Sequence, residues 1–137
     1  MQAFGARLAV RLQPGDVIAL SGELGTGKTT LARAVIAALG HRGEVPSPTF
    51  TLVETYDPPE VRLPVVHADF YRLERPAEAD ELGLDDYREG AVLIAEWPEQ
   101  VGGFSGEPGC LSIALKIAGK GRTAIVEPGV AWQGRLP

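Results

Sequence analysis

The residues Gly22-Glu23-Leu24-Gly25-Thr26-Gly27-Lys28-Thr29 match the phosphate-loop pattern G-x-x-x-x-G-K-[ST] at every fixed position. Glycines at these positions let successive backbone N–H groups turn inward toward phosphate oxygens, and the following helix adds its positive N-terminal end. In this pattern the Lys28 ammonium reaches the β- and γ-phosphates, and the Thr29 hydroxyl ligates Mg²⁺. The sequence therefore predicts a nucleoside triphosphate site with contacts from Glu23, Leu24, Gly25, Thr26, Gly27, Lys28, Thr29 and Thr30.

The segments on either side of this loop suit a strand and a helix. Residues 17–20 form a short apolar run that is typical of a buried strand. Residues 28–39 place Leu31 and Val35 on one helical face, and Gly40 is a suitable C-terminal stop. A strand, a loop and a helix in this order are the context that a phosphate loop requires, which argues against a chance match of the glycine pattern.

The rest of the chain divides into further predicted helices and strands. We expect helices over residues 4–12 and 77–82, strands over 50–56, 63–69 and 91–96, and a hairpin of strands 111–117 and 122–127. This order predicts an α/β fold whose sheet has antiparallel edges. The length suits a single domain over residues 1–137.

Composition excludes several classes of protein. The 137 residues are 45% hydrophobic and 23% charged, which is a globular balance rather than that of a disordered chain. The apolar runs are too short to cross a bilayer, so we expect no membrane association. Cys110 is the only cysteine and there are two histidines, so we expect a reducing, cytoplasmic setting without a structural zinc site.

The charge is unevenly distributed along the chain. Residues 60–100 carry 11 acids and four arginines, within a chain of net charge −5. Proteins that grip nucleic acid usually carry a basic patch instead. We therefore do not expect the chain to bind RNA or DNA directly, while a role in a nucleic-acid process through a protein partner stays open.

Two acidic residues end apolar runs and are candidates for positioning a metal ion. Asp69 follows residues 65–68, and Glu96 follows residues 92–95. A phosphate loop needs an acid at the end of a nearby strand to hold Mg²⁺ and its waters. The pattern alone does not rank the two, and either acid by itself could instead accept a loop N–H.

Other residues near these acids have two readings each. Trp97 could shield the site or stack on a partner, or it could be an ordinary core or edge tryptophan. Ser47 and Thr49 could reach the γ-phosphate or its attacking water, or they could cap a proline-braced turn. His67 is expected to pack and hydrogen-bond inside the sheet rather than to act in catalysis.

Four blocks in this order and spacing resemble one known family. They are residues 22–30 (GELGTGKTT), 47–50 (SPTF), 67–73 (HADFYRL) and 96–99 (EWPE). Together they resemble TsaE, also called YjeE, the ATPase component of bacterial tRNA threonylcarbamoyladenosine synthesis. The phosphate loop alone would not single out this family, but the other three blocks together are specific to it, and the resemblance covers nearly the whole chain.

The resemblance implies a fold, a function and partners. The fold would be a phosphate-loop NTPase-like three-layer sandwich with a C-terminal antiparallel hairpin. Slow hydrolysis of ATP with Mg²⁺ would support the TsaD and TsaB proteins, with tRNA reached only through that complex. Thr29 and Glu96 would be the Mg²⁺ ligands. Lys28 and Asp69 would be the catalytic residues, Asp69 lying by the γ-phosphate, and residues 47–49 would form a switch segment.

One position departs from the family pattern. The family usually carries a threonine three residues before the Phe-Gly pair, near the bound base, and Met1 stands there in this sequence. Either the base side of the pocket is built differently or the native chain starts further upstream.

Two other functions share the same motifs. A small-molecule kinase would need arginines in a lid, and Arg72, Arg75 and Arg88 lie in an acidic background that disfavours a phosphate clamp. A nucleotide-dependent switch with negligible hydrolysis is the other alternative. Arg33 is expected to point away from the phosphates and Arg122 to lie in a distant hairpin, so we expect a partner to supply the missing positive group.

Overall fold

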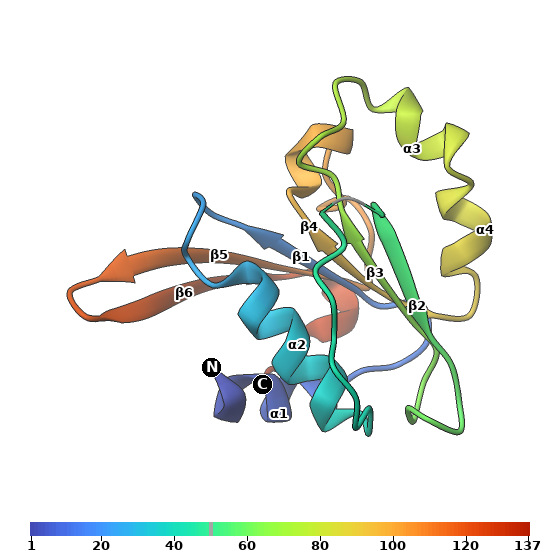
Figure 1. Cartoon of the computed structure of the whole chain (residues 1–137). Coiled ribbons are helices and arrows are strands. Elements are labelled where there is room, and N and C mark those ends of the chain that lie inside the picture. Colours follow the sequence, from blue (N-terminus) through green and yellow to red (C-terminus); the bar gives the residue numbers. More distant parts are fainter. Residues whose placement is uncertain (50) are drawn as a thin grey trace.

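The computed structural model describes residues 1–49 and 51–137, and their strands form one mixed six-stranded sheet in the order β2-β3-β4-β1-β5-β6 (Figure 1). The strands are β1 (Val17–Ser21), β2 (Val53–Tyr56), β3 (Val65–Asp69), β4 (Val92–Glu96), β5 (Cys110–Ala118) and β6 (Gly121–Pro128). β1 pairs in parallel with β4 and β5, and β3 pairs in parallel with β4. The edge strands β2 and β6 are antiparallel to their neighbours, as the sequence predicts.

Helices cover both faces of this sheet and make three layers (Figure 1). α1 (Gln2–Ala9) and α2 (Lys28–Ala38) pack on one face, and α3 (Ala77–Glu81) and α4 (Leu84–Arg88) lie on the other. Short 3₁₀ turns follow at Pro98–Val101 and Val130–Trp132. None of the described helices is long and apolar enough to span a membrane.

The two apolar cores follow from the period-2 alternation of the strands. In β1, Ile18 and Leu20 belong to the core beneath α1 and α2, whereas Val17 and Ala19 belong to the core on the opposite face. α1 and α2 approach each other closely at Gly5, where an added Cβ would lie 2.6 Å from the Cβ of Ala34. β1 is therefore buried on both faces of the sheet, and the glycine-rich loop starts from the end of this buried strand.

The structure differs from the sequence-based element bounds by more than two residues in three places. The first helix runs from Gln2 to Ala9 rather than over residues 4–12, and β2 begins only at Val53. The predicted strand start at Phe50 lies outside the described residues. The region after residue 77 holds two short helices, because Gly83 at φ 76° turns the chain between them.

The sheet register brings the candidate site together at one edge. Because β1, β3 and β4 are parallel, their carboxyl ends lie side by side, with Glu96 opposite both Leu20 and Asp69. The glycine-rich loop leaves β1 at this same edge. The two acids that the sequence could not rank are thus neighbours beside the loop.

Candidate functional site

The phosphate-loop segment has a backbone that only glycine adopts readily. Gly22 has φ 135° and Gly27 has φ 102°. A Cβ at Gly22 would also lie 2.5 Å from the carbonyl oxygen of Leu115 in β5. Inside the loop, the Thr26 hydroxyl donates to the Glu23 carbonyl at 2.8 Å. The loop is therefore stabilised by an internal hydrogen bond, and its first glycine packs closely against β5.

A cavity of about 390 Å³ opens beside this loop. Its lining combines the loop and the start of α2 with the ends of β3 and β4 and one residue of β6. The lining residues are Leu24, Gly25, Gly27, Lys28, Thr29, Thr30, Thr49, Asp69, Tyr71, Glu96, Trp97 and Arg122. Of the eight residues predicted to bind, Glu23 and Thr26 do not line the cavity, but they form the hydrogen bond that shapes the loop.

The Lys28 ammonium lies at the centre of this arrangement. Its Nζ donates to the carbonyl oxygens of Gly22 at 2.5 Å and Glu23 at 2.9 Å. Nζ also lies 4.3 Å from the centroid of the Trp97 ring. Burial lowers the pKa of Lys28, while the negative charges of Glu96, Glu99 and Asp69 oppose that shift.

Glu96 is a buried carboxylate held on both oxygens. The Thr29 hydroxyl donates to Oε1 at 2.6 Å, and Nε2 of His67 lies 2.6 Å from Oε2. His67 is fully buried, and its Nδ1 has no hydrogen-bond partner in the part of the chain that the structure describes. The expectation that His67 packs and hydrogen-bonds inside the sheet agrees with this position.

Asp69 is also buried, but its partners differ from those of Glu96. Thr49 Oγ1 donates to Oδ2 at 3.1 Å, and the Tyr71 backbone N–H donates to Oδ1 at 3.0 Å. The Ser47 and Thr49 hydroxyls lie 2.8 Å apart. The segment before Phe50 is thereby tied to the end of β3, with Thr49 lining the cavity.

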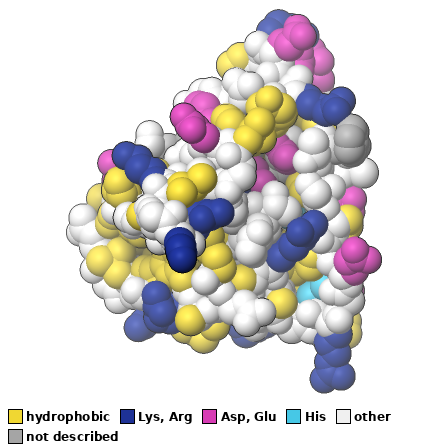
Figure 2. Space-filling model, turned by 60° about the vertical axis from the view of Figure 1, so that its left-hand side comes forward, with side chains coloured by type: hydrophobic (Ala, Val, Ile, Leu, Met, Phe, Trp, Pro, Cys, Tyr) yellow, Lys and Arg dark blue, Asp and Glu magenta, His cyan; other side chains and the backbone are white. Residues whose placement is uncertain are grey.

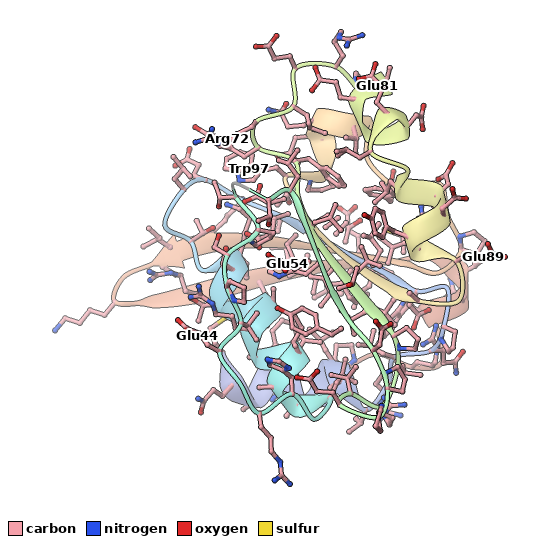
Figure 3. All side chains as sticks on the ribbon, turned by 45° about the vertical axis from the view of Figure 1, so that its right-hand side comes forward. Glu44, Glu54, Arg72, Glu81, Glu89 and Trp97 are labelled. Atoms are coloured by element: carbon pink, nitrogen blue, oxygen red, sulfur yellow. The ribbon has the colours of Figure 1, made fainter. Side chains whose placement is uncertain are left out.

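Trp97 belongs to the wall of the cavity and is only partly buried. It has φ 58°, and its ring packs against that of Tyr71 with centroids 4.8 Å apart. Figure 3 labels Trp97 in the upper part of the molecule, and both Trp97 and Tyr71 line the cavity. Of the two readings of Trp97, the one that places it at the site fits this position.

Arg122 is where the sequence-based expectation is wrong. Its Nε donates to the Thr26 carbonyl at 3.1 Å, and its Nη2 donates to the Gly25 carbonyl at 3.2 Å. The hairpin is far from the loop in sequence, but β5 pairs with β1, which brings β6 and the loop together (Figure 1). Arg33 does point away, because its Nε donates to the Val45 carbonyl at 2.8 Å.

The donor set suits a hard divalent cation. Thr29 Oγ1 and Glu96 Oε1 are oxygen donors 2.6 Å apart on the cavity wall. Among the described residues, no three His, Cys, Asp or Glu side chains gather into a metal cluster. Mg²⁺ typically takes one or two protein oxygens and completes its shell with waters and substrate phosphates. The residues present therefore fit Mg²⁺ better than a metal that needs an all-protein cage.

Comparison with known proteins supports this fold and shows the family of the chain. The family model described as Threonylcarbamoyl adenosine biosynthesis protein TsaE matches residues 1–124. The chain belongs to the TsaE family. A crystal structure of Bacillus subtilis YdiB resembles it with a TM-score of 0.69 and 32% identity, covering 91% of this chain and 75% of that one.

Curated relatives carry the name tRNA threonylcarbamoyladenosine biosynthesis protein TsaE. The Streptomyces coelicolor protein is 44% identical over 100 residues, which cover 72% of this chain and 68% of that protein. The Bacillus subtilis protein is 41% identical over 97 residues, which cover 70% of this chain and 59% of the relative. The match to a Mycobacterium tuberculosis TsaE covers 61% of that protein, so the chain spans about two thirds or less of the length of such relatives.

Proposed function

We propose that this TsaE-family protein binds ATP with Mg²⁺ and hydrolyses it slowly, in support of tRNA threonylcarbamoyladenosine formation by TsaD and TsaB. One observation carries the proposal: a single cavity is lined by the loop ammonium of Lys28, the hydroxyl of Thr29 and the carboxylates of Asp69 and Glu96. These are the group types that phosphoryl transfer to water requires. The names of the relatives and the family model support the role in tRNA modification.

Each side chain has a distinct task in this proposal. The loop N–H groups and the α2 N-terminus bind the phosphates, and the Lys28 ammonium moves from the loop carbonyls to the β- and γ-phosphate oxygens. Thr29 and Glu96 would hold Mg²⁺, which neutralises phosphate charge when bound. Asp69 would orient the attacking water near the γ-phosphate, and Thr49 links residues 47–49 to that carboxylate.

The base side of the nucleotide has a candidate location as well. A second hollow of about 540 Å³ is lined by Met1, Phe4, Arg7 and residues of the β5–β6 hairpin. It shares Arg122 with the first cavity. The nucleoside would lie there, on the side where the family resemblance places the base contacts and where Met1 stands in this chain.

The contacts of the arginines argue against a kinase. Arg88 pairs with Glu107, and Arg75 lies 3.6 Å from the carboxylates of both Glu78 and Glu81. Two of the three arginines near a possible lid thus already contact carboxylates. A lid arginine must instead reach the phosphate that is transferred.

A turnover assay with purified protein tests the proposal. We expect slow release of phosphate by the wild type and none by Lys28→Ala, which should also bind ATP more weakly while keeping its fold. Lys116→Ala is the control, because Lys116 is exposed on β5 and lines neither hollow. Unchanged hydrolysis in Lys28→Ala would refute the phosphate-loop mechanism. ATP binding without hydrolysis, even with TsaD and TsaB present, would favour the nucleotide-dependent switch.

A further inference from the structure

Arg122 reaches the phosphate-loop segment from the far end of the chain. It stands opposite Ile117 in the hairpin register, and its guanidinium donates to the carbonyl oxygens of Gly25 and Thr26. It lines both the 390 Å³ cavity beside the loop and the neighbouring 540 Å³ hollow. Arg122 therefore stands at the boundary between the two spaces.

Among the residues that the structure describes, the hydrogen-bond partners of Arg122 are all uncharged carbonyl groups. Two of its contacts are to loop carbonyls and a third, from Nη1, is to the carbonyl of Gly121. No carboxylate lies within ion-pair distance of it among residues 1–49 and 51–137, in contrast to Arg88 and Arg135, which pair with acids. A guanidinium carries five N–H donors, so donors remain for a further acceptor.

A positive charge held at this place suits an anion. Guanidinium groups bind phosphate oxygens with two parallel hydrogen bonds, and they keep their charge at any physiological pH. The loop carbonyls orient the guanidinium, and the cavity that it lines also contains the Lys28 ammonium. A polyphosphate chain that runs from the loop toward the second hollow passes both cations.

We propose that Arg122 is a second phosphate-binding cation, supplied by this chain itself and contacting the polyphosphate chain of the bound nucleotide. This rests on the proposed function, and it replaces the expectation that a partner must supply the positive group. The alternative role for Arg122 is that of a brace, in which it only holds the loop carbonyls and does not touch the ligand.

Inorganic tripolyphosphate is the probe that separates these roles, because it has no base or ribose. Its affinity is measured by competition with a fluorescent ATP analogue for the wild type, Arg122→Ala, Arg122→Gln and Arg122→Lys. Gln can still donate to the loop carbonyls but has no charge. Lys116→Ala removes a charge from the same hairpin without touching either hollow.

We expect tripolyphosphate affinity to fall about tenfold to a hundredfold in both Arg122→Ala and Arg122→Gln, the range for a lost charged hydrogen bond. Arg122→Lys should retain more affinity than Arg122→Gln, and Lys116→Ala should stay within about twofold of the wild type. Circular dichroism checks that each variant is folded. If Arg122→Ala does not fold, the difference in tripolyphosphate affinity between Arg122→Gln and Arg122→Lys tests the proposal.

Three results would overturn the proposal. Equal affinity in Arg122→Gln and the wild type, with loss only in Arg122→Ala, would make Arg122 a brace. Unchanged tripolyphosphate affinity with weaker binding of adenosine would make it a contact to the nucleoside. A wild type that binds neither ATP nor tripolyphosphate would refute the proposed function itself. In that case Lys28→Ala would show the same lack of binding as the wild type, which distinguishes this outcome from the other two.

Discussion

His67 Nε2 and Glu96 Oε2 lie 2.6 Å apart across β3 and β4, although the strand register pairs His67 with Ile94. The histidine thus reaches diagonally toward the carboxyl end of β4. Because a carboxylate oxygen only accepts, the Nε2–H of His67 donates to Oε2 of Glu96, whereas Nδ1 is buried without a partner among the described residues. His67 therefore fixes one oxygen of Glu96 while Thr29 contacts the other.

We predict that His67→Phe lowers the free energy of unfolding by about 1–3 kcal/mol, because the buried Oε2 of Glu96 loses its donor. The same variant should need more Mg²⁺ for half-maximal turnover, since the carboxylate is no longer oriented. His67→Gln, whose amide can donate, should recover part of both losses. Denaturant titration and Mg²⁺ titration are the measurements, with His41→Gln as the control. A stability loss without any change in Mg²⁺ dependence would leave His67 a purely structural residue.

The two buried acids should respond differently to removal of their charge. Glu96→Gln should raise the Mg²⁺ requirement, because an amide oxygen is a poorer ligand for a hard cation. Asp69→Asn should lower turnover more than it changes the Mg²⁺ dependence, since Asp69 contacts Thr49 and Tyr71 rather than Thr29. Turnover measured across a Mg²⁺ series distinguishes the two. The reverse pattern would mean that Asp69 is the metal ligand and Glu96 the residue that orients water.

Gly22→Ala should disrupt the loop from its first residue. An alanine at φ 135° is strained by about 1–3 kcal/mol, and its Cβ would press on the Leu115 carbonyl. We expect a lower melting temperature and weaker ATP binding. Gly106→Ala is the matched control, because an added Cβ there meets nothing within 4 Å. Wild-type ATP affinity in Gly22→Ala would show that the loop conformation is not what the ligand requires.

The sequence predicts best where local signals coincide. β1 and α2 are bounded by turn residues and glycines, and the structure places them within one residue of the predicted ranges. The predicted helix over residues 77–82 ends just before Gly83, as α3 does, but α4 beyond that glycine was not predicted. The positions of Asp69 and Glu96 at strand ends could be read from the apolar runs that precede them.

The rest of the site depends on strand order, which no local pattern encodes. Thr29 bonds to Glu96 only because β4 lies beside β1, and Arg122 reaches Gly25 only because β5 lies on the other side. The contact between His67 and Glu96 depends in addition on a diagonal arrangement, because the register places His67 opposite Ile94. Such contacts join residues that are distant in sequence, so they become visible only in the assembled sheet.

The acidic surface should favour a basic partner. Asp85, Asp86 and Glu89 are exposed in and just after α4, and Figure 3 shows Glu81 and Glu89 on the outer side of the molecule away from Trp97. Figure 2 shows another view of the surface, on which basic and acidic side chains are interspersed. We predict that binding to TsaD and TsaB weakens as salt screens this charge.

Neutralising those three acids together should slow association roughly twofold to tenfold at low salt, and the difference should fade at high salt. The matched control neutralises Glu44, Asp57 and Glu127, three exposed acids elsewhere on the chain. Surface-bound binding kinetics at several salt concentrations provide the measurement, and the turnover assay with partners is run in parallel. If the association rate changes neither with salt concentration nor on neutralisation of the three acids, the partner interface lies on another face.

The place of β1 in the sheet also governs the order in which the protein can fold during synthesis. Its two neighbours, β4 and β5, are made only after residues 92–96 and 110–118 have left the ribosome. Until then the apolar residues of β1 lack both strands that cover their backbone, so the loop and its helix emerge long before they can be fixed. Contacts of such long sequence separation are slow to form, and the nascent chain therefore carries an unpaired central strand through most of its translation.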